Sequence, residues 1–220
     1  GSPVCRDGPQ GGFLTRPLPT RLIKAATHVG ALLPLAILAF DYFSDQLGPN
    51  PAQTLEQRTG RIAITLLTAT LLVAPLARLF KQPVLLRMRR LLGLYTFLYV
   101  SLHLFILVGF DYRFDFPLLA GSYFGKPFIW LGLATGLILA ALALTSFDWW
   151  KRRLGRWWVR LHRLIYLAAI LDLAHFFLAV KGNILSLSGN LTLPLIYSTA
   201  ILIALILRLP PPNRSAAPHS

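Results

Sequence analysis

The sequence predicts an all-α, polytopic membrane bundle of six transmembrane helices, and three observations support this prediction. The chain of 220 residues is 55% hydrophobic, with a mean hydropathy of +0.59, which is more apolar than a soluble domain of this size requires. Its apolar residues form six long runs separated by short polar segments. Basic residues gather in those segments, with tryptophan and tyrosine beside them, as is typical of the two membrane interfaces.

Each apolar run is close to the roughly twenty residues that a helix needs to cross a bilayer core of about 30 Å. The expected spans are 22–43, 60–80, 91–110, 128–147, 159–180 and 191–209. Pro34 and Pro75 fall inside the first two spans, where membrane helices accommodate proline as a kink. The span 159–180 is the most polar, because it contains His162, Asp172 and His175.

The six spans are expected to form one haem-binding membrane domain over residues 16–209. Residues 1–15 open with Gly-Ser and without methionine, which predicts a tag remnant or a disordered end. Residues 210–220 are polar and rich in proline, which predicts a disordered tail. The single cysteine, Cys5, excludes an intrachain disulfide and a cysteine-ligated cluster.

The loops on one side of the predicted bundle carry thirteen basic residues, and those on the other side carry four. The positive-inside rule therefore predicts that both termini are cytoplasmic. This distribution assigns the net charge of +14 to membrane topology, so no nucleic-acid partner is expected. The cytoplasmic set is Arg16, Arg21, Lys24, Lys81, Arg87, Arg89, Arg90, Lys151, Arg152, Arg153, Arg156, Arg208 and Arg214; the outer set is Arg58, Arg113, Lys126 and Lys181.

Histidines inside the third and fifth spans indicate haem ligation. A neutral imidazole in lipid is costly unless it is used. The two spans start at the same face, and His103 and His175 lie thirteen residues after Arg90 and His162, respectively. His103 and His175 are thus expected at one depth in the outer half, as the two axial ligands of one haem iron. His162 shares an inner layer with Arg90, and arginine is not an iron ligand.

The inner layer leaves several roles open. Thirteen residues rise about 20 Å along a helix, which is the scale for two stacked cofactors. They also turn about 220° beyond whole turns, so two such positions do not lie on one ideal face. Either the helix is distorted or the two cofactor layers are approached from different sides. His162 is a candidate iron ligand, or a contact of a flavin, a haem propionate or a lipid headgroup. Arg90 suits a flavin phosphate or a propionate. Asp172 lies one turn before His175 and is a candidate hydrogen-bond partner for that imidazole.

Several motifs, in order along residues 20–209, resemble one known family, the MsrQ family. These are the haem-binding membrane subunits of periplasmic methionine-sulfoxide reductase systems, within the ferric-reductase-like transmembrane superfamily. The motifs are APLAR (74–78), KQP (81–83), RRLLGL (89–94), LHL (102–104), LALTS (142–146), LGRWW (154–158) and LH (161–162), followed by His175.

The resemblance implies a non-catalytic electron-transfer subunit in a bacterial inner membrane. Electrons from a cytoplasmic flavin reductase or from the quinone pool would pass to MsrP, the periplasmic molybdenum-cofactor enzyme that repairs methionine sulfoxide in proteins. It also implies haem b, with FMN as a further cofactor. Superfamily members usually carry four histidines in two layers. Here Arg90 stands where the fourth would be, so one haem is expected and a second is left open.

Two other functions are compatible with the residues. The first is a stand-alone transmembrane haem reductase that acts on ferric iron or is linked to quinone. The second is a haem-free transporter or scaffold, in which the histidines are proton relays or hydrogen-bonding groups between helices. A reduced absorption spectrum with or without b-type bands separates haem-bearing from haem-free functions.

Overall fold

The computed structural model describes residues 19–180, 182–183, 188–189 and 191–208. The predicted terminal segments 1–15 and 210–220 lie outside these residues, as does Cys5. In the described part, the long elements are α1 (Thr20–Phe43), α2 (Pro51–Leu79), α3 (Met88–Phe105), α5 (Pro127–Leu144), α8 (Leu164–Ala179) and α9 (Thr192–Ile206). The short ones are η1 (Pro83–Arg87), η2 (Ile106–Asp111), α4 (Phe116–Tyr123), α6 (Asp148–Leu154), α7 (Arg156–His162), β1 (Gly182–Asn183) and β2 (Ser188–Gly189).

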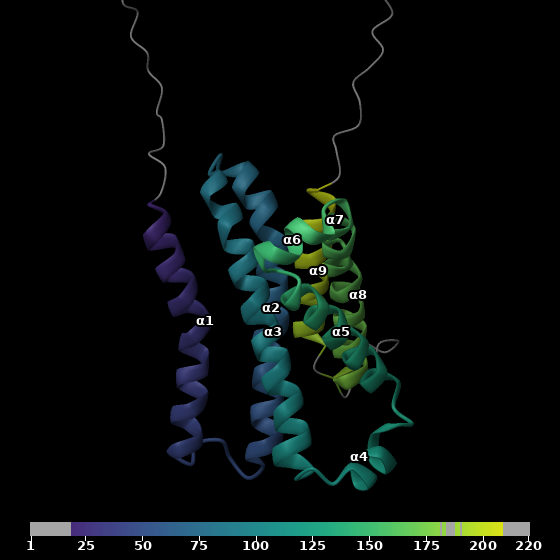
Figure 1. The fold of residues 1–220 in the computed structure, drawn as a ribbon. Coiled ribbons are helices and arrows are strands. Elements are labelled where there is room, and N and C mark those ends of the chain that lie inside the picture. The colour runs from purple at the N-terminus through teal and green to yellow at the C-terminus, as the bar shows by residue number, and fades with distance from the viewer. Residues whose placement is uncertain (1–18, 181, 184–187, 190, 209–220) are drawn as a thin grey trace, which may run out of the picture.

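Among the described residues, five helical segments are long and apolar enough to cross a bilayer, namely Thr20–Phe43, Pro51–Leu79, Pro83–Asp111, Pro127–Leu144 and Arg156–Ala179. The sixth expected span corresponds to α9, which has 15 residues and a length of about 22 Å. The chain runs up and down between the two ends of the bundle, as the predicted topology requires (Figure 1). The all-α class and the multi-pass membrane architecture are therefore confirmed.

Two predicted spans differ from uninterrupted α-helices. The span 159–180 is broken after His162, where Arg163 forms a turn between α7 and α8. The span 91–110 ends in the π-helix η2. Such local departures change the angular relation between residues on either side of them. The break at Arg163 lies between His162 and His175. In an ideal helix, the thirteen residues that separate these two histidines would not place them on one face.

Two helices begin at capping residues, which a hydropathy pattern does not reveal. The helix expected from residue 60 begins at Pro51, because the Asn50 side chain accepts a hydrogen bond from the Gln53 amide, at 3.2 Å. Proline at the first helical position is favoured because its missing N–H has no acceptor there in any case. Asp115 caps α4 in the same manner through the Leu118 amide.

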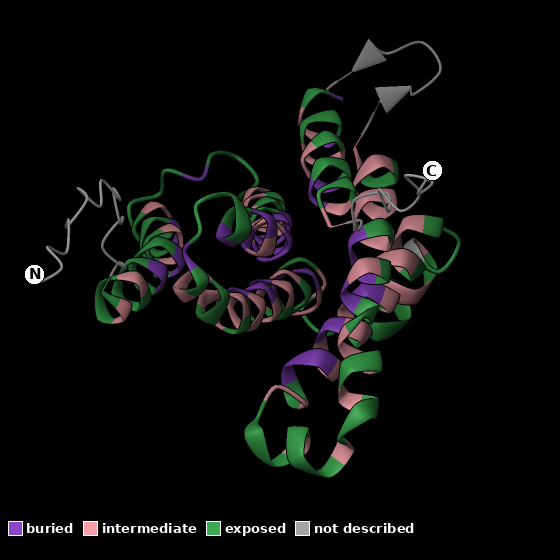
Figure 2. Cartoon of the chain, turned by 90° about the horizontal axis from the view of Figure 1, so that it is seen from above, coloured by how far each residue is buried: buried purple, intermediate pink, exposed green. Residues whose placement is uncertain are grey.

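Two helical hairpins form the centre of the molecule, α2 with α3 and α5 with α8. A core cluster joins them to α9 through Leu67 of α2, Leu139 of α5, Ala168 of α8 and Ile201 of α9. Figure 2, seen from above, shows the buried residues turned between helices and many exposed residues on the outer sides. Large apolar side chains are prominent among the exposed residues, which is the surface expected of helices that face lipid.

Helix α1 attaches to the first hairpin through α3. Tyr99 of α3 is fully buried and its hydroxyl donates a hydrogen bond to the Ala31 carbonyl of α1, at 2.6 Å. His28 of α1 pairs through Nδ1 with the Tyr95 hydroxyl, also at 2.6 Å. The described chain thus places α1 beside α2 and α3, on the far side from α8 (Figure 1).

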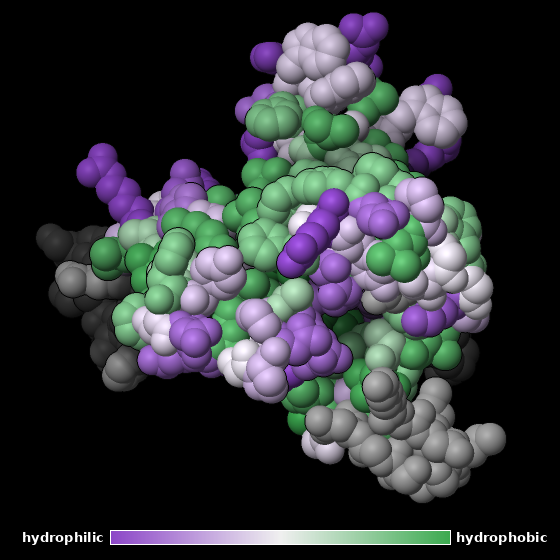
Figure 3. All heavy atoms as spheres, turned by 90° about the horizontal axis from the view of Figure 1, so that it is seen from below, coloured by the Kyte–Doolittle hydropathy of each residue, from purple (hydrophilic) through white to green (hydrophobic). Residues whose placement is uncertain are grey.

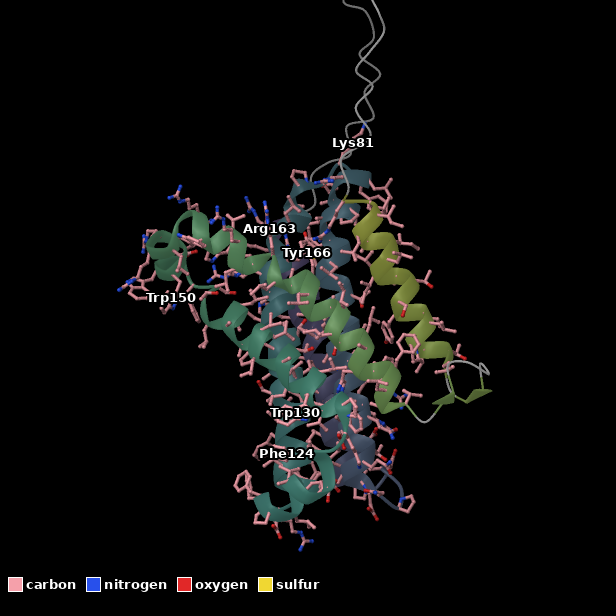
Figure 4. The ribbon with its side chains drawn as sticks, turned by 90° about the vertical axis from the view of Figure 1, so that its right-hand side faces the viewer. Lys81, Phe124, Trp130, Trp150, Arg163 and Tyr166 are labelled. Atoms are coloured by element: carbon pink, nitrogen blue, oxygen red, sulfur yellow. The ribbon has the colours of Figure 1, made fainter. Side chains whose placement is uncertain are left out.

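The start of α1 and the end of α9 lie at the same end of the bundle as η1, α6 and α7 (Figure 1). Lys81 and Arg163 lie toward this end in Figure 4, and Trp150 marks where α6 stands away from the bundle. We call it the basic end, because η1, α6 and α7 carry most of the basic residues between the spans. Figure 3 looks at the opposite end, where hydrophilic side chains lie between the hydrophobic flanks of the bundle.

Candidate functional site

The two hairpins bring His103 and His175 together. His103 lies near the end of α3 and His175 near the end of α8. Their ring centroids are 6.3 Å apart and their planes are perpendicular, at 90°. Both side chains are half-buried. The predicted pairing of these two histidines at one depth is therefore what the structure contains.

Each imidazole is fixed by a backbone carbonyl of the partner helix in its own hairpin. His103 Nδ1 lies 2.9 Å from the Glu56 carbonyl of α2, and His175 Nδ1 lies 2.7 Å from the Phe128 carbonyl of α5. A carbonyl only accepts hydrogen bonds, so in each neutral ring Nδ1 must carry the proton. Nε2 is then left with an unshared electron pair, which is the form in which histidine binds a metal.

The spacing of the pair fits a single iron between the rings. An iron about 2 Å from each Nε2 separates the two ring centroids by roughly 6 Å, once the half-width of each ring is added, and the observed separation is 6.3 Å. Within the described residues, no group of three or more histidine, cysteine, aspartate or glutamate side chains could hold a metal ion. Two protein ligands suit a porphyrin, since its four nitrogens complete the coordination of the iron.

Asp172 does not orient His175. The Nδ1 atom of His175 donates to the Phe128 carbonyl, and Asp172 makes no hydrogen bond or ion pair within the described part of the chain. The prediction that Asp172 bonds the ligand imidazole is therefore wrong. Sequence spacing placed the carboxyl within one turn of the ring, but the ring is directed across to α5 rather than along its own helix.

His162 lies at the other end of the bundle and is not held across helices. Its Nδ1 atom is 3.1 Å from the Trp158 carbonyl of its own helix, and its ring stacks on the Trp158 indole with centroids 4.0 Å apart. Nε2 is buried and has no hydrogen-bond partner in the described chain. A buried nitrogen left unpaired costs about 1–3 kcal/mol, which favours a ligand at this position.

Arg90 is exposed at the start of α3 and forms an ion pair with Asp148 of α6, at 3.4 Å. Arg90 was predicted to share a layer with His162, and the ion pair with Asp148 does not test that prediction. Arg89 is the neighbouring cation that lies within electrostatic range of His162. An arginine with a single long, exposed ion pair is still able to bind a phosphate or a propionate.

Sequence reasoning missed the two carbonyl acceptors, Glu56 and Phe128. Backbone groups carry no side-chain signature, so no motif identifies them. One numerical signal was present: the two acceptors are 72 residues apart, the same offset that relates His103 to His175.

Comparison with known proteins agrees with the geometry. The family described as ferric reductase like transmembrane component matches residues 59–173, a range that contains His103 and ends two residues before His175. Several relatives carry the name protein-methionine-sulfoxide reductase heme-binding subunit MsrQ. The relative from Cronobacter sakazakii is 44% identical over 163 residues, 72% of this chain and 80% of the relative.

Two further relatives with the same name extend the match. The protein from Pectobacterium atrosepticum is 41% identical over 187 residues, 84% of this chain and 90% of its own length. The protein from Xanthomonas campestris pv. campestris is 41% identical over 167 residues, 73% of this chain and 77% of its own. The chain therefore belongs to the MsrQ family of ferric-reductase-like transmembrane proteins.

Proposed function

We propose that this protein is a transmembrane electron-transfer subunit that carries b-type haem. In this proposal it passes electrons from a cytoplasmic flavin reductase or the quinone pool to the periplasmic molybdenum-dependent methionine-sulfoxide reductase MsrP. The relatives are named as heme-binding subunits of a protein-methionine-sulfoxide reductase, which supports the assignment. The bilayer is that of a bacterial inner membrane, with the basic end and both termini in the cytoplasm.

The observation that carries the proposal is the perpendicular imidazole pair, with both Nδ1 atoms occupied by backbone carbonyls. His103 and His175 would hold the iron of one haem through Nε2. When bound, this group accepts and releases one electron without transfer of an atom to the protein. The hydrogen bonds to Glu56 and Phe128 keep the rings oriented and make Nε2 a stronger electron donor. His103 and His175 lie near the ends of α3 and α8 that are farther from the basic end, on the side where a periplasmic partner would receive electrons.

At the basic end we propose a second cofactor contact at His162 and Arg90, with His162 also a candidate iron ligand. The unpaired, buried Nε2 atom of His162 supports it. The cofactor is either FMN, whose phosphate suits Arg90 and Arg89, or a second haem held through His162 and a weaker ligand. Counting haem and flavin per purified chain separates the two versions: two haems with no flavin would exclude the FMN version.

The electron-transfer function can be tested with the purified protein in lipid nanodiscs. Its haem is reduced with a quinol, or with a flavin reductase and its reductant, and the b-type absorption bands are recorded. Adding oxidised MsrP should then reoxidise the haem, and substituting MsrP that lacks the molybdenum cofactor should not. A haem that reduces fully but never responds to MsrP would favour a stand-alone ferric or quinone-linked reductase. A chain that binds no haem would leave the transporter or scaffold function.

A further inference from the structure

Two glycines repeat beside the histidine pair with the same 72-residue offset. Gly60 of α2 lies four residues after Glu56, and Gly132 of α5 lies four residues after Phe128. Residues four apart lie one above the other on a helix. Each imidazole thus lies against one face of the neighbouring helix. On that face a backbone carbonyl accepts a hydrogen bond from Nδ1, and a glycine follows one turn later.

The close approach of each ring requires the missing side chain. A Cβ atom added at Gly132 would lie 2.8 Å from His175 Nδ1 and 2.9 Å from Cε1 of the same ring. One added at Gly60 would lie 3.3 Å from both His103 Nδ1 and His103 Cε1. The first distance is below any normal carbon contact, and the second is tight. Any larger residue at Gly132 must displace the ring or the helix.

Other helical glycines show that this crowding is local. A Cβ atom at Gly136, one turn further along α5, would meet only Val100 Cγ1 at an ordinary 3.6 Å, and one at Gly93 of α3 would meet nothing within 4 Å. Gly132 and Gly136 form a Gly-x-x-x-Gly pattern, which by itself indicates only close helix packing. The structure separates the two: Gly132 contacts the imidazole and Gly136 does not.

We propose that Gly60 and Gly132 are positioning residues for the histidine ligands. By leaving the helix surface flat, they let each imidazole approach its carbonyl acceptor, so that the Nδ1 proton is held and Nε2 is aimed at the iron. A Cβ atom would lengthen the Nδ1–carbonyl hydrogen bond and tilt the ring. This inference rests on the proposed function, in which both rings ligate one haem.

The test compares Gly132→Ala and Gly60→Ala with the matched controls Gly136→Ala and Gly93→Ala. All four replace a membrane-helix glycine by the same residue, so general effects on helix stability are shared. Each variant is purified in nanodiscs, stripped of haem and titrated with hemin to obtain an affinity. Its midpoint potential is then measured by spectroelectrochemical titration.

Gly132→Ala is expected to weaken hemin affinity by about 10- to 100-fold, the usual effect of disturbing a group that orients a metal ligand, and to shift the midpoint potential. Gly60→Ala should show a smaller effect in the same direction, and both controls should match the wild type. If Gly132→Ala does not yield folded protein, Gly60→Ala decides the question, because its contact is only tight.

Wild-type affinity and potential in both Gly132→Ala and Gly60→Ala would overturn this inference while leaving the proposed function intact. Equal losses in all four variants would also overturn it, since the effect would then be one of helix packing. A wild-type chain that binds no hemin would instead overturn the proposed function itself.

Discussion

The hairpin of α2 and α3 and the hairpin of α5 and α8 carry the same arrangement at one end and different residues at the other. At the first end, each contributes a histidine, a carbonyl acceptor and a glycine, all related by 72 positions. At the basic end, the positions related by the same offset hold Arg90 of α3 and His162 of α7, the short helix that precedes α8. One site is thus built from two like halves, and the other from unlike residues.

The largest expected effect tests the equivalence of the two halves. His103→Ala and His175→Ala should each lower haem occupancy by more than about tenfold, because removing an axial ligand does more than disturbing its orientation. Haem per chain, measured by the pyridine haemochrome method, checks this. His28→Ala is the matched control, since His28 is exposed and bonded to Tyr95. Retention of full haem in His175→Ala would contradict the paired-ligand site.

The next effect tests the difference at the basic end. His162→Ala should remove the inner cofactor, whether FMN or a second haem, and leave the haem between His103 and His175 spectrally intact. Arg90→Ala should have a smaller effect, because Arg90 is exposed and solvent screens its interaction with a bound anion. Flavin and haem counts on both variants provide the measurement. Unchanged counts in His162→Ala would show that the unlike residues form no cofactor site.

The hairpins also differ in their neighbours, since α1 packs mainly on the first hairpin. Tyr99→Phe removes the buried hydrogen bond from α3 to Ala31 of α1 and should lower the free energy of unfolding by about 1 kcal/mol. Thermal unfolding in nanodiscs measures the loss, with haem content unchanged. Tyr95→Phe, at a half-buried position, is the control and should cost less. A loss of haem in Tyr99→Phe would mean that α1 helps to form the site.

The smallest expected effect concerns the carboxyl of Asp172 in α8. The position 72 residues earlier, in α3, is Val100, so the first hairpin has no such carboxyl. Asp172→Asn should leave hemin affinity unchanged, since His175 Nδ1 is already bonded to the Phe128 carbonyl. Hemin titration of this variant beside Gly132→Ala sharpens the comparison. Loss of affinity in Asp172→Asn alone would assign the orienting role to the carboxylate.

The sequence was sufficient to predict the helical membrane architecture and the pairing of His103 with His175. Both depend on properties visible in the residues, namely apolar runs of bilayer length and histidines at equal depth. It was not sufficient for the partners of the rings, because Glu56 and Phe128 act through their carbonyls. The sequence also did not indicate the role proposed for Gly60. That role depends on the close approach of the His103 ring, which only the structure shows.

Helix breaks were the other feature that hydropathy could not supply. The turn at Arg163 lies inside a run that reads as one span, and no proline or glycine marks it. The π-helix that ends the third span contains Gly109, but hydropathy does not predict it either. Local propensity gives only a weak preference and does not predict these departures. The pairing of Arg90 with Asp148 likewise depends on how α6 folds back toward α3.

The perpendicular planes of His103 and His175 have a magnetic consequence. When two axial imidazoles are parallel, their π-orbitals act on the same iron d-orbital and separate it in energy from its perpendicular partner. At 90° each ring acts on a different one of the two, and they become nearly equal in energy. If His103 and His175 hold a haem iron as proposed, its oxidised, low-spin form should therefore give a strongly anisotropic electron paramagnetic resonance signal, with one g-value far from the other two.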